Sequence, residues 1–404
     1  MSGIYIHIPF CKQACHYCDF HFSTSLKWKD ELLQCLIKEI ELRKEELNDS
    51  TIETIYFGGG TPSLLTIEEL NLLIETVYKN FSVVANPEIT LEANPDDLIL
   101  IEMSVRAQSR TIFEDYKNIG INRLSIGIQS FFDEDLQMMN RAHTSVEAKE
   151  SLSMATRHFD NITIDLIYGI PNMTNERWKE NLQVAFDFGI NHISSYALTI
   201  EPKTALATFI RQGKYPNVSE ETALAHFNIL VDETSTQGFV QYEISNFGKQ
   251  DYFSKHNTSY WKGKPYLGIG PSAHSFQGKQ RSWNVSNNIK YIKAINQNEL
   301  PSENEILSDK DSFNEYIMTG LRTIWGVSLE NIEKNFGLEI KNQLLKNSEK
   351  FFNNKLLIIS NIDEHNNVFY EKAPWEASEN IQYLRTTSKG KFLVDGIASD
   401  LFMI

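Results

Sequence analysis

The sequence predicts an α/β protein with three parts: a partial (β/α)6 barrel over residues 1–215, a small α+β linking region over 216–300, and a winged-helix-like domain over 301–404. Three observations predict this fold. Short β-branched runs alternate with amphipathic stretches in the first half, this alternation fades after Pro216, and the tail combines helical stretches with a hairpin pattern. Strands that alternate with helices form a parallel sheet with helices packed outside it.

The barrel elements follow from hydrophobic periodicity. Helical stretches carry apolar residues at three- and four-residue spacing, whereas the strand-like runs are short and rich in β-branched residues. The predicted strands are 4–8, 54–57, 88–92, 123–128, 162–167 and 192–198, and the predicted helices include 27–46, 67–79, 146–158 and 175–188. Six such units favour a partial barrel over a closed eight-unit barrel, which needs about 250 residues. An open doubly wound sheet is the alternative, because one sequence does not fix the strand order.

The second half differs in composition from the barrel. Residues 220–237 form one predicted helix, and an aromatic, glycine-rich stretch runs from Phe239 to Phe276. Segment 99–110, within the barrel, is predicted to be an extra loop or helical turn. The predicted tail elements are helices 312–322, 329–336 and 340–353, strands 356–360 and 368–370, and a closing helix 387–401. Helices combined with a two-stranded hairpin predict the winged-helix-like domain.

Charge and cysteine distribution limit the function classes. The formal net charge is −15, so the chain repels phosphate backbones and we expect no non-specific nucleic-acid binding. No apolar run approaches the roughly 20 residues of a membrane span, and no signal-peptide pattern is visible, so we expect a cytoplasmic protein. Three of the four cysteines lie close together in the sequence, and in a cytosolic protein such a cluster indicates a metal site.

Cys11, Cys15 and Cys18 form a Cys-x3-Cys-x2-Cys loop directly after the first predicted strand. Three thiolates can bind three irons of a [4Fe–4S] cluster, which leaves the fourth iron open to another ligand. Zinc is the competing interpretation, because His16 or His21 would complete the four protein ligands of a structural zinc site. The remaining alternative, three unrelated core cysteines, is rare at this spacing.

The cysteine spacing, its place after the first strand and the aromatic Tyr17 resemble the radical S-adenosylmethionine superfamily. The resemblance implies a [4Fe–4S] cluster whose open iron binds S-adenosylmethionine, and reduction then cleaves this ligand to methionine and a 5′-deoxyadenosyl radical. A Gly-Gly-Gly-Thr-Pro loop at 58–62 follows the second strand and supports the resemblance. In isolation, this loop is equally well explained as a tight turn.

Polar residues also follow the later strands, at the strand ends where the active sites of barrels lie. Taken singly, each of them is also explained as a capping or turn residue. The resemblance implies that Cys11, Cys15 and Cys18 bind the cluster. It also implies that S-adenosylmethionine is contacted by Tyr5, Gly59, Gly60, Thr61, Glu92, Gln129, Arg141, Asp165 and Ala197.

Within the superfamily, the chain is similar to the HemN/HemW branch over nearly its whole length. This branch holds haem chaperones and the oxygen-independent coproporphyrinogen III oxidases of porphyrin biosynthesis. The similar segments include His7–Cys11, Ser125–Phe131, Asp165–Pro171 and Gly320–Arg322. The oxidases carry a fourth cysteine where this chain has Phe20, and they carry a long extension before the first strand, which here starts at Ile4. Both differences imply a haem chaperone without oxidase activity, and oxidase activity is the alternative function.

A His-Asn-x-x-Tyr-Trp motif at 256–261 is characteristic of the chaperone group. The resemblance implies that His256, Tyr260 and Trp261 bind haem, since histidine is a common axial ligand and aromatic rings offer apolar surface. The alternative is that these side chains pack a domain junction, and His274 is a second candidate ligand.

The resemblance also implies partners. They are haem itself, a membrane haem-protein acceptor of the respiratory chain, an electron donor or a bacterioferritin-type haem donor, and a second copy of the chain. Such a protein would be cytoplasmic and peripheral at the membrane.

Overall fold

The structure is a computed structural model that describes residues 2–47, 50–99, 111–361 and 382–404. The chain forms two compact units: residues 1–240, 247–260 and 264–305 make the first, and 241–246, 261–263 and 306–404 make the second. The predicted strand 368–370 and, apart from Ile99, the predicted loop 99–110 lie outside the described residues. In the described ranges, no helix is long and apolar enough to cross a membrane.

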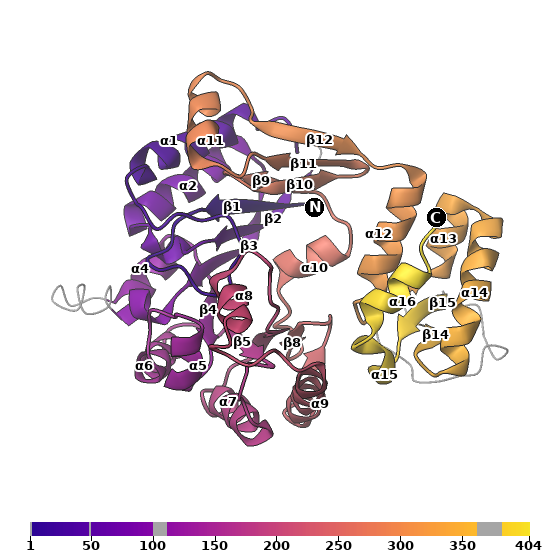
Figure 1. Cartoon of the computed structure of the whole chain (residues 1–404). Coiled ribbons are helices and arrows are strands. Elements are labelled where there is room, and N and C mark those ends of the chain that lie inside the picture. The colour runs from indigo at the N-terminus through magenta and orange to yellow at the C-terminus, as the bar shows by residue number, and fades with distance from the viewer. Residues whose placement is uncertain (1, 48–49, 100–110, 362–381) are drawn as a thin grey trace. The chain divides into compact units, whose positions relative to one another are not determined.

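The first unit is built on six parallel strands that pair in chain order (Figure 1). They are β1 (Ser2–Ile8), β2 (Ile52–Gly59), β3 (Val83–Ala93), β4 (Arg123–Gln129), β5 (Ile162–Tyr168) and β6 (His192–Ala197). This sequential order excludes the doubly wound alternative, in which the strand order reverses partway across the sheet. The predicted α/β class and parallel sheet are confirmed.

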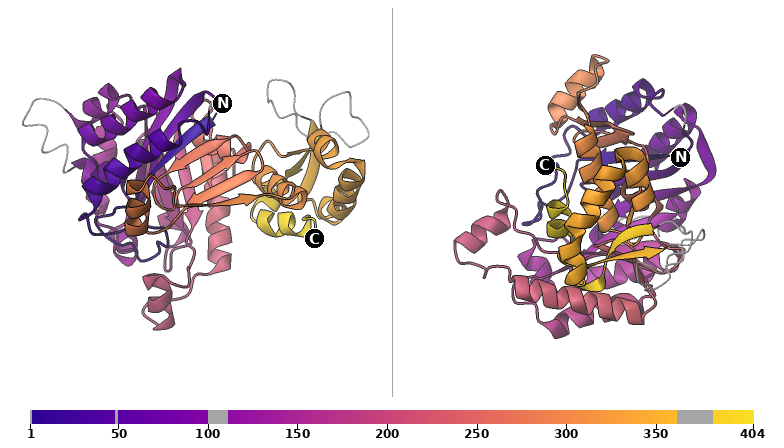
Figure 2. Two further views of the ribbon diagram at one scale, coloured as in Figure 1. Left: turned by 90° about the horizontal axis from the view of Figure 1, so that it is seen from above. Right: turned by 90° about the vertical axis from the view of Figure 1, so that its right-hand side faces the viewer.

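Helices connect the consecutive strands and lie along the sheet (Figure 2). The connections contain α1 (Lys29–Leu42), η1 (Pro62–Leu64), α2 (Ile67–Asn80), α4 (Ile112–Asn118), α5 (Asp133–Met138), α6 (Ser145–Ala155) and α7 (Asn175–Asp187). Capping boxes begin α2, α4 and α6, where a threonine side chain and a glutamate three residues later satisfy free backbone N–H groups. Each of the four helices predicted here overlaps an observed helix, and its ends differ by at most four residues.

The core of the first unit lies between the sheet and these helices. Ile4, Ile6 and Ile8 of β1 are buried, and nearly every other residue of β1 is buried as well. Burial on both faces is typical of parallel strands and explains their continuous apolar runs. In α1, Leu32, Leu36 and Ile40 recur at four-residue spacing and are all buried, so they form the apolar stripe of an amphipathic helix.

The chain after β6 first forms α8, α9 and α10. Their bounds, with those of two short strands between them, are α8 (Ala205–Arg211), α9 (Glu220–Thr236), β7 (Val240–Gln241), β8 (Asn246–Gly248) and α10 (Lys255–Trp261). The helix predicted over 220–237 is therefore confirmed. Beyond β1, the sheet continues through β9 (Tyr266–Ile269), which pairs parallel with β1, and then through β10 (His274–Gln277), β11 (Gln280–Asn284) and β12 (Ser302–Ile306), with α11 (Asn288–Asn296) between the last two.

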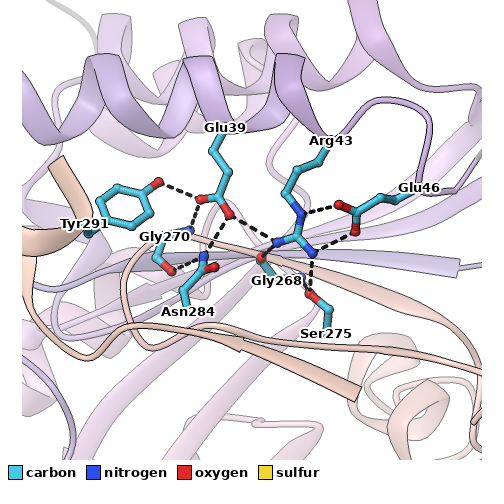
Figure 3. A network of polar contacts seen from close by, with 8 residues as sticks. All are labelled: Glu39, Arg43, Glu46, Gly268, Gly270, Ser275, Asn284 and Tyr291. Atoms are coloured by element: carbon cyan, nitrogen blue, oxygen red, sulfur yellow. Dashed lines mark hydrogen bonds and ion pairs between the residues drawn. The ribbon is translucent and has the colours of Figure 1, made fainter. Parts of the chain in front are cut away.

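A buried polar network connects α1 to residues 268–291, which belong to the part of the chain that extends the sheet beyond β1 (Figure 3). Each oxygen of the Glu39 carboxylate accepts two hydrogen bonds. The donors are Arg43 Nη1 at 3.1 Å, Asn284 Nδ2 at 2.7 Å, Gly270 N at 2.8 Å and Tyr291 Oη at 2.6 Å. A buried carboxylate is tolerated only when it is paired and hydrogen-bonded in this way. The network therefore holds the segment from β9 to α11 against α1.

The second unit contains helices and a three-stranded antiparallel sheet in the order β13-β15-β14. Its elements are α12 (Asp309–Leu321), β13 (Val327–Ser328), α13 (Leu329–Phe336), α14 (Leu338–Asn353), β14 (Leu357–Asn361), β15 (Gln382–Thr386), α15 (Ser388–Lys391) and α16 (Val394–Asp400). The three predicted tail helices and the predicted strand 356–360 are confirmed, whereas β15 was not predicted. The winged-helix-like character of this unit stays a prediction.

The prediction of one closing helix over 387–401 is wrong, because the chain breaks between α15 and α16. Gly390 lies against the backbone of Leu356: a Cβ atom there would come within 2.2 Å of the Leu356 carbonyl oxygen. The break lets Val394 and Ile397 reach the core, while Leu393 stays exposed. Tertiary packing overrides local helix propensity here.

Candidate functional site

The carboxyl ends of the parallel strands meet at one edge of the sheet, and a cavity of about 530 Å³ lies there within the first unit. This volume is typical of sites for small molecules and cofactors. Every residue predicted to bind the cluster or S-adenosylmethionine lines it, namely Cys11, Cys15, Cys18, Tyr5, Gly59, Gly60, Thr61, Glu92, Gln129, Arg141, Asp165 and Ala197. The predicted haem residues His256, Tyr260 and Trp261 do not line it.

The cysteine loop follows β1 and presents three free, half-buried thiols to the cavity. Its base is closed by two backbone hydrogen bonds, Cys11 N to Ser23 O at 3.0 Å and Ser23 N to Pro9 O at 2.9 Å. Burial raises the pKa of the Cys11 thiol to about 11 and also raises the pKa of Cys18. A metal that binds here must therefore displace thiol protons.

The loop fits an iron–sulfur cluster better than a single zinc ion. In the part of the chain that the structure describes, no three His, Cys, Asp or Glu side chains converge closely enough to hold one metal ion. A [4Fe–4S] cluster needs no such convergence, because each thiolate binds a different iron. The two candidate fourth zinc ligands make other contacts: His16 Nδ1 lies 2.9 Å from Met138 O, and His21 Nε2 lies 2.7 Å from Asn288 Oδ1.

The glycine loop after β2 brings backbone close to both the cavity and the cysteine loop. Gly59 has φ of +111°, and a Cβ atom there would come within 2.5 Å of the His7 ring. At Gly60 a Cβ atom would lie 2.6 Å from Phe10 O, and Gly60 N donates to Ile8 O at 2.9 Å. Only glycine allows these approaches. The loop therefore forms a wall of the cavity made of backbone.

Two half-buried carboxylates, Glu92 and Asp165, face this cavity. Tyr56 Oη donates to Glu92 Oε1 at 2.8 Å, and Gly59 N donates to Oε2 at 3.1 Å. Burial, helped by repulsion from Asp165, raises the pKa of Glu92 to about 7, and burial raises the pKa of Asp165 to about 6. Two such carboxylates in one cavity favour a positively charged ligand, such as one with an ammonium or sulfonium group.

Arg141 connects the ends of β3 and β4 to the cysteine loop. Its Nη2 donates to Asn94 Oδ1 at 2.6 Å and to Gly127 O at 2.8 Å, and its Nη1 lies 3.4 Å from Cys15 Sγ. Gln129 ends β4 with φ of +67°, which turns the chain at the cavity edge. A guanidinium beside the thiols stabilises their anionic form and so favours metal binding.

The predicted haem residues lie on α10, and none of them lines the cavity, although the His256 ring lies 6.4 Å from the ring of the cavity residue Tyr5. His256 is buried, and both ring nitrogens have partners: Nδ1 lies 2.7 Å from Thr54 Oγ1 and Nε2 lies 2.6 Å from Tyr260 Oη. The His256 ring also stacks on Tyr56, with centroids 4.9 Å apart. Burial lowers the pKa of His256 to about 3, so the imidazole is neutral. Trp261, at the end of α10, belongs to the second unit.

Several cavity residues were not among the predicted contacts. His7 Nδ1 lies 3.0 Å from Tyr5 Oη, and its Nε2 lies 3.1 Å from His21 O, so His7 connects β1 to the cysteine loop. Lys12 forms ion pairs with Asp96 and Asp97, which join the cysteine loop to the end of β3. Two adjacent aspartates directly after a predicted strand are a sequence signal for the ion pairs with Lys12.

Comparison with known proteins identifies the family of this chain. The family model of the Radical SAM superfamily matches residues 5–185. The protein named "Heme chaperone HemW" of Bacillus subtilis (strain 168) is 32% identical over 83% of this chain and 87% of its own length. Its namesake in Lactococcus lactis subsp. lactis (strain IL1403) is 32% identical over 88% of this chain and 90% of its own length.

The fold also matches a solved structure. Coproporphyrinogen III oxidase (HemN) from Escherichia coli superposes with a TM-score of 0.80 over 99% of this chain and 90% of that chain. The sequence identity in this alignment is 21%, so the match concerns the fold alone. The identity to the curated relatives, over most of both chains, is what shows the family. The chain belongs to the HemW family of the radical SAM superfamily.

Proposed function

We propose that this protein is a haem chaperone that binds haem and delivers it to membrane haem proteins such as respiratory cytochromes. We further propose that its barrel holds a [4Fe–4S] cluster and S-adenosylmethionine. One observation carries the cofactor part: three thiols and two carboxylates of raised pKa line one cavity in a member of this family. The haem part rests on the relatives, which are named heme chaperones.

Different residues of the cavity would hold the two cofactors. Cys11, Cys15 and Cys18 would each bind one iron and leave the fourth iron open. Glu92 and Asp165 would pair with positive charge on S-adenosylmethionine, while the backbone of the glycine loop lies against it. With S-adenosylmethionine bound, a reduced cluster would supply the electron for cleavage of the sulfonium. Arg141, next to Cys15, would offset the negative charge of the cluster ligands.

On the haem side, the proposal assigns His256 as the axial ligand. Its neutral imidazole suits iron binding, because a protonated ring nitrogen cannot donate to a metal. Ligation through Nε2 requires the Tyr260 hydroxyl to move away, which breaks one hydrogen bond and costs about 1 kcal/mol. A haem–histidine bond offsets a cost of that size, so the proposal includes a movement of Tyr260.

Oxidative decarboxylation of coproporphyrinogen III is the alternative function. Phe20 lines the cavity and stands where the oxidases have a cysteine. Its phenyl ring supplies no thiol there. Anaerobic reconstitution followed by separate assays for haem binding and for coproporphyrinogen conversion tests the two functions. We expect haem binding without conversion. Conversion to protoporphyrinogen without haem binding would overturn the proposal and establish the alternative.

A further inference from the structure

Two cation–indole pairs lie together in the second unit. The guanidinium carbon of Arg322 lies 5.5 Å from the centroid of the Trp261 ring, and Lys262 Nζ lies 4.3 Å from the centroid of the Trp325 ring. Trp261 and Lys262 are neighbours in the chain, and Arg322 and Trp325 are three residues apart. We call these four residues the cation–indole cluster. It joins the end of the motif at 256–261 to the Gly320–Arg322 segment, some 60 residues further along.

The cluster is accessible and retains hydrogen-bonding capacity. Lys262 is exposed, and Trp261, Arg322 and Trp325 are half-buried. Arg322 Nη1 forms an ion pair with Asp395, whose side chain is 65% exposed. The Arg322 side chain is 22% exposed, and a guanidinium carries several N–H donors, so the ion pair with Asp395 leaves donors for a further ligand. A guanidinium beside an indole suits a ligand that combines an apolar ring with a carboxylate.

We propose that the cation–indole cluster is the site for the haem propionates. Haem is a flat apolar ring with two carboxylates at one edge, and the cluster presents two cations beside two indole rings. Lys262 and Arg322 would each pair with a propionate, and Trp261 and Trp325 would contact the ring edge. This inference rests on the proposed haem-binding function. All four residues of the cluster belong to the second unit, and Lys262, Arg322 and Trp325 lie outside the motif at 256–261.

A purely structural role is the competing explanation. Arg322 is the C-cap of α12, and the cation–π contacts could serve only to fix residues 261–263 to this helix. That role predicts lower stability in the variants but no dependence of binding on the charge of the ligand. A ligand without free carboxylates therefore separates the two explanations.

The test uses the full-length chain and two probes, haem and its dimethyl ester, in which both propionates are neutral. Soret titrations give the affinity for each probe. We expect Lys262→Gln and Arg322→Gln each to weaken haem binding about tenfold and to leave ester binding unchanged. Trp325→Leu should weaken both probes about equally, because it removes apolar surface rather than charge.

One variant is expected to gain affinity. Asp395→Asn removes the carboxylate that competes for Arg322, so haem should bind several-fold more tightly while the ester is unaffected. The matched control is Lys389→Gln, which removes an exposed lysine of the same unit and should change neither affinity. Thermal unfolding of each variant provides the fraction of folded protein, to which every affinity is normalised.

The outcomes separate this inference from the proposed function. If the parent chain does not bind haem, the proposed function is wrong and the inference falls with it. If the parent binds haem but the charge variants lose both probes alike, or lose neither, haem binding stands and the propionate site is wrong. Selective loss of haem, together with the gain in Asp395→Asn, supports the site.

Discussion

Glu92→Gln is the sharpest perturbation of the proposed S-adenosylmethionine site. The glutamine amide keeps the shape of the side chain and can preserve both contacts. Its oxygen can accept the Gly59 N–H, and its NH₂ group can donate to Tyr56 Oη. The substitution therefore removes a charge from the cavity while it retains the hydrogen bonds and the packing.

The magnitude follows from the raised pKa of Glu92, from 4.5 to about 7. A carboxyl group with a raised folded-state pKa holds its proton more tightly in the folded state, so stability falls as the pH rises from about 4.5 to 7. The shift corresponds to at most about 3 kcal/mol, and screening through the open cavity reduces this to about 1–2 kcal/mol. Without ligand, Glu92→Gln should thus be more stable than the parent at pH 8 and about equal at pH 4.

S-adenosylmethionine should reverse this advantage. Loss of the carboxylate removes a charge-assisted contact of about 1.5–3 kcal/mol, which corresponds to roughly 10- to 100-fold weaker binding. Thermal unfolding at pH 4 and 8, and calorimetric titration of the reconstituted chain at pH 8, measure the two effects. Glu75→Gln, at an exposed position on α2, is the control for loss of one negative charge. If the variant binds S-adenosylmethionine like the parent and shows no gain at pH 8, Glu92 does not face the bound cation.

Further predictions concern the cluster, the pH dependence and haem. Replacing Cys11, Cys15 or Cys18 with serine should abolish the iron and sulfide content after anaerobic reconstitution. The control Cys35→Ser, in α1, should retain the iron and sulfide. One zinc per chain and no iron in the parent would contradict this prediction. Affinity for S-adenosylmethionine should fall as the pH drops below about 7 and 6, because Glu92 and Asp165 become protonated; a flat titration profile between pH 5 and 8 would argue against both contacts. His256→Ala should lose the two hydrogen bonds of its ring and about 2–3 kcal/mol of stability, and should show a weaker Soret band per folded molecule. His274→Ala, which removes the second candidate ligand, should leave the Soret band unchanged; the reverse pattern would exclude His256 as the ligand.

The cysteine loop and the strand-end residues could be predicted from the sequence for one physical reason. Parallel strands place all their carboxyl ends at one edge, so residues that follow successive strands meet there without any knowledge of long-range contacts. Cys11 follows β1, Gly59 ends β2, and Glu92 and Asp165 lie near the carboxyl ends of β3 and β5; all four line the cavity. Local periodicity also located the helices of the barrel, because their apolar stripes are encoded within each segment.

Contacts between distant segments were decided only by the tertiary structure. Three features depend on partners far away in the chain. They are the sequential strand order, the break between α15 and α16, and the contacts of Glu39 with the segment from β9 to α11. The same holds for His256, whose buried position follows from Thr54 of β2, and for Arg322, which lies over Trp261. No local pattern encodes these pairs, because packing and desolvation select them only when the chain has folded.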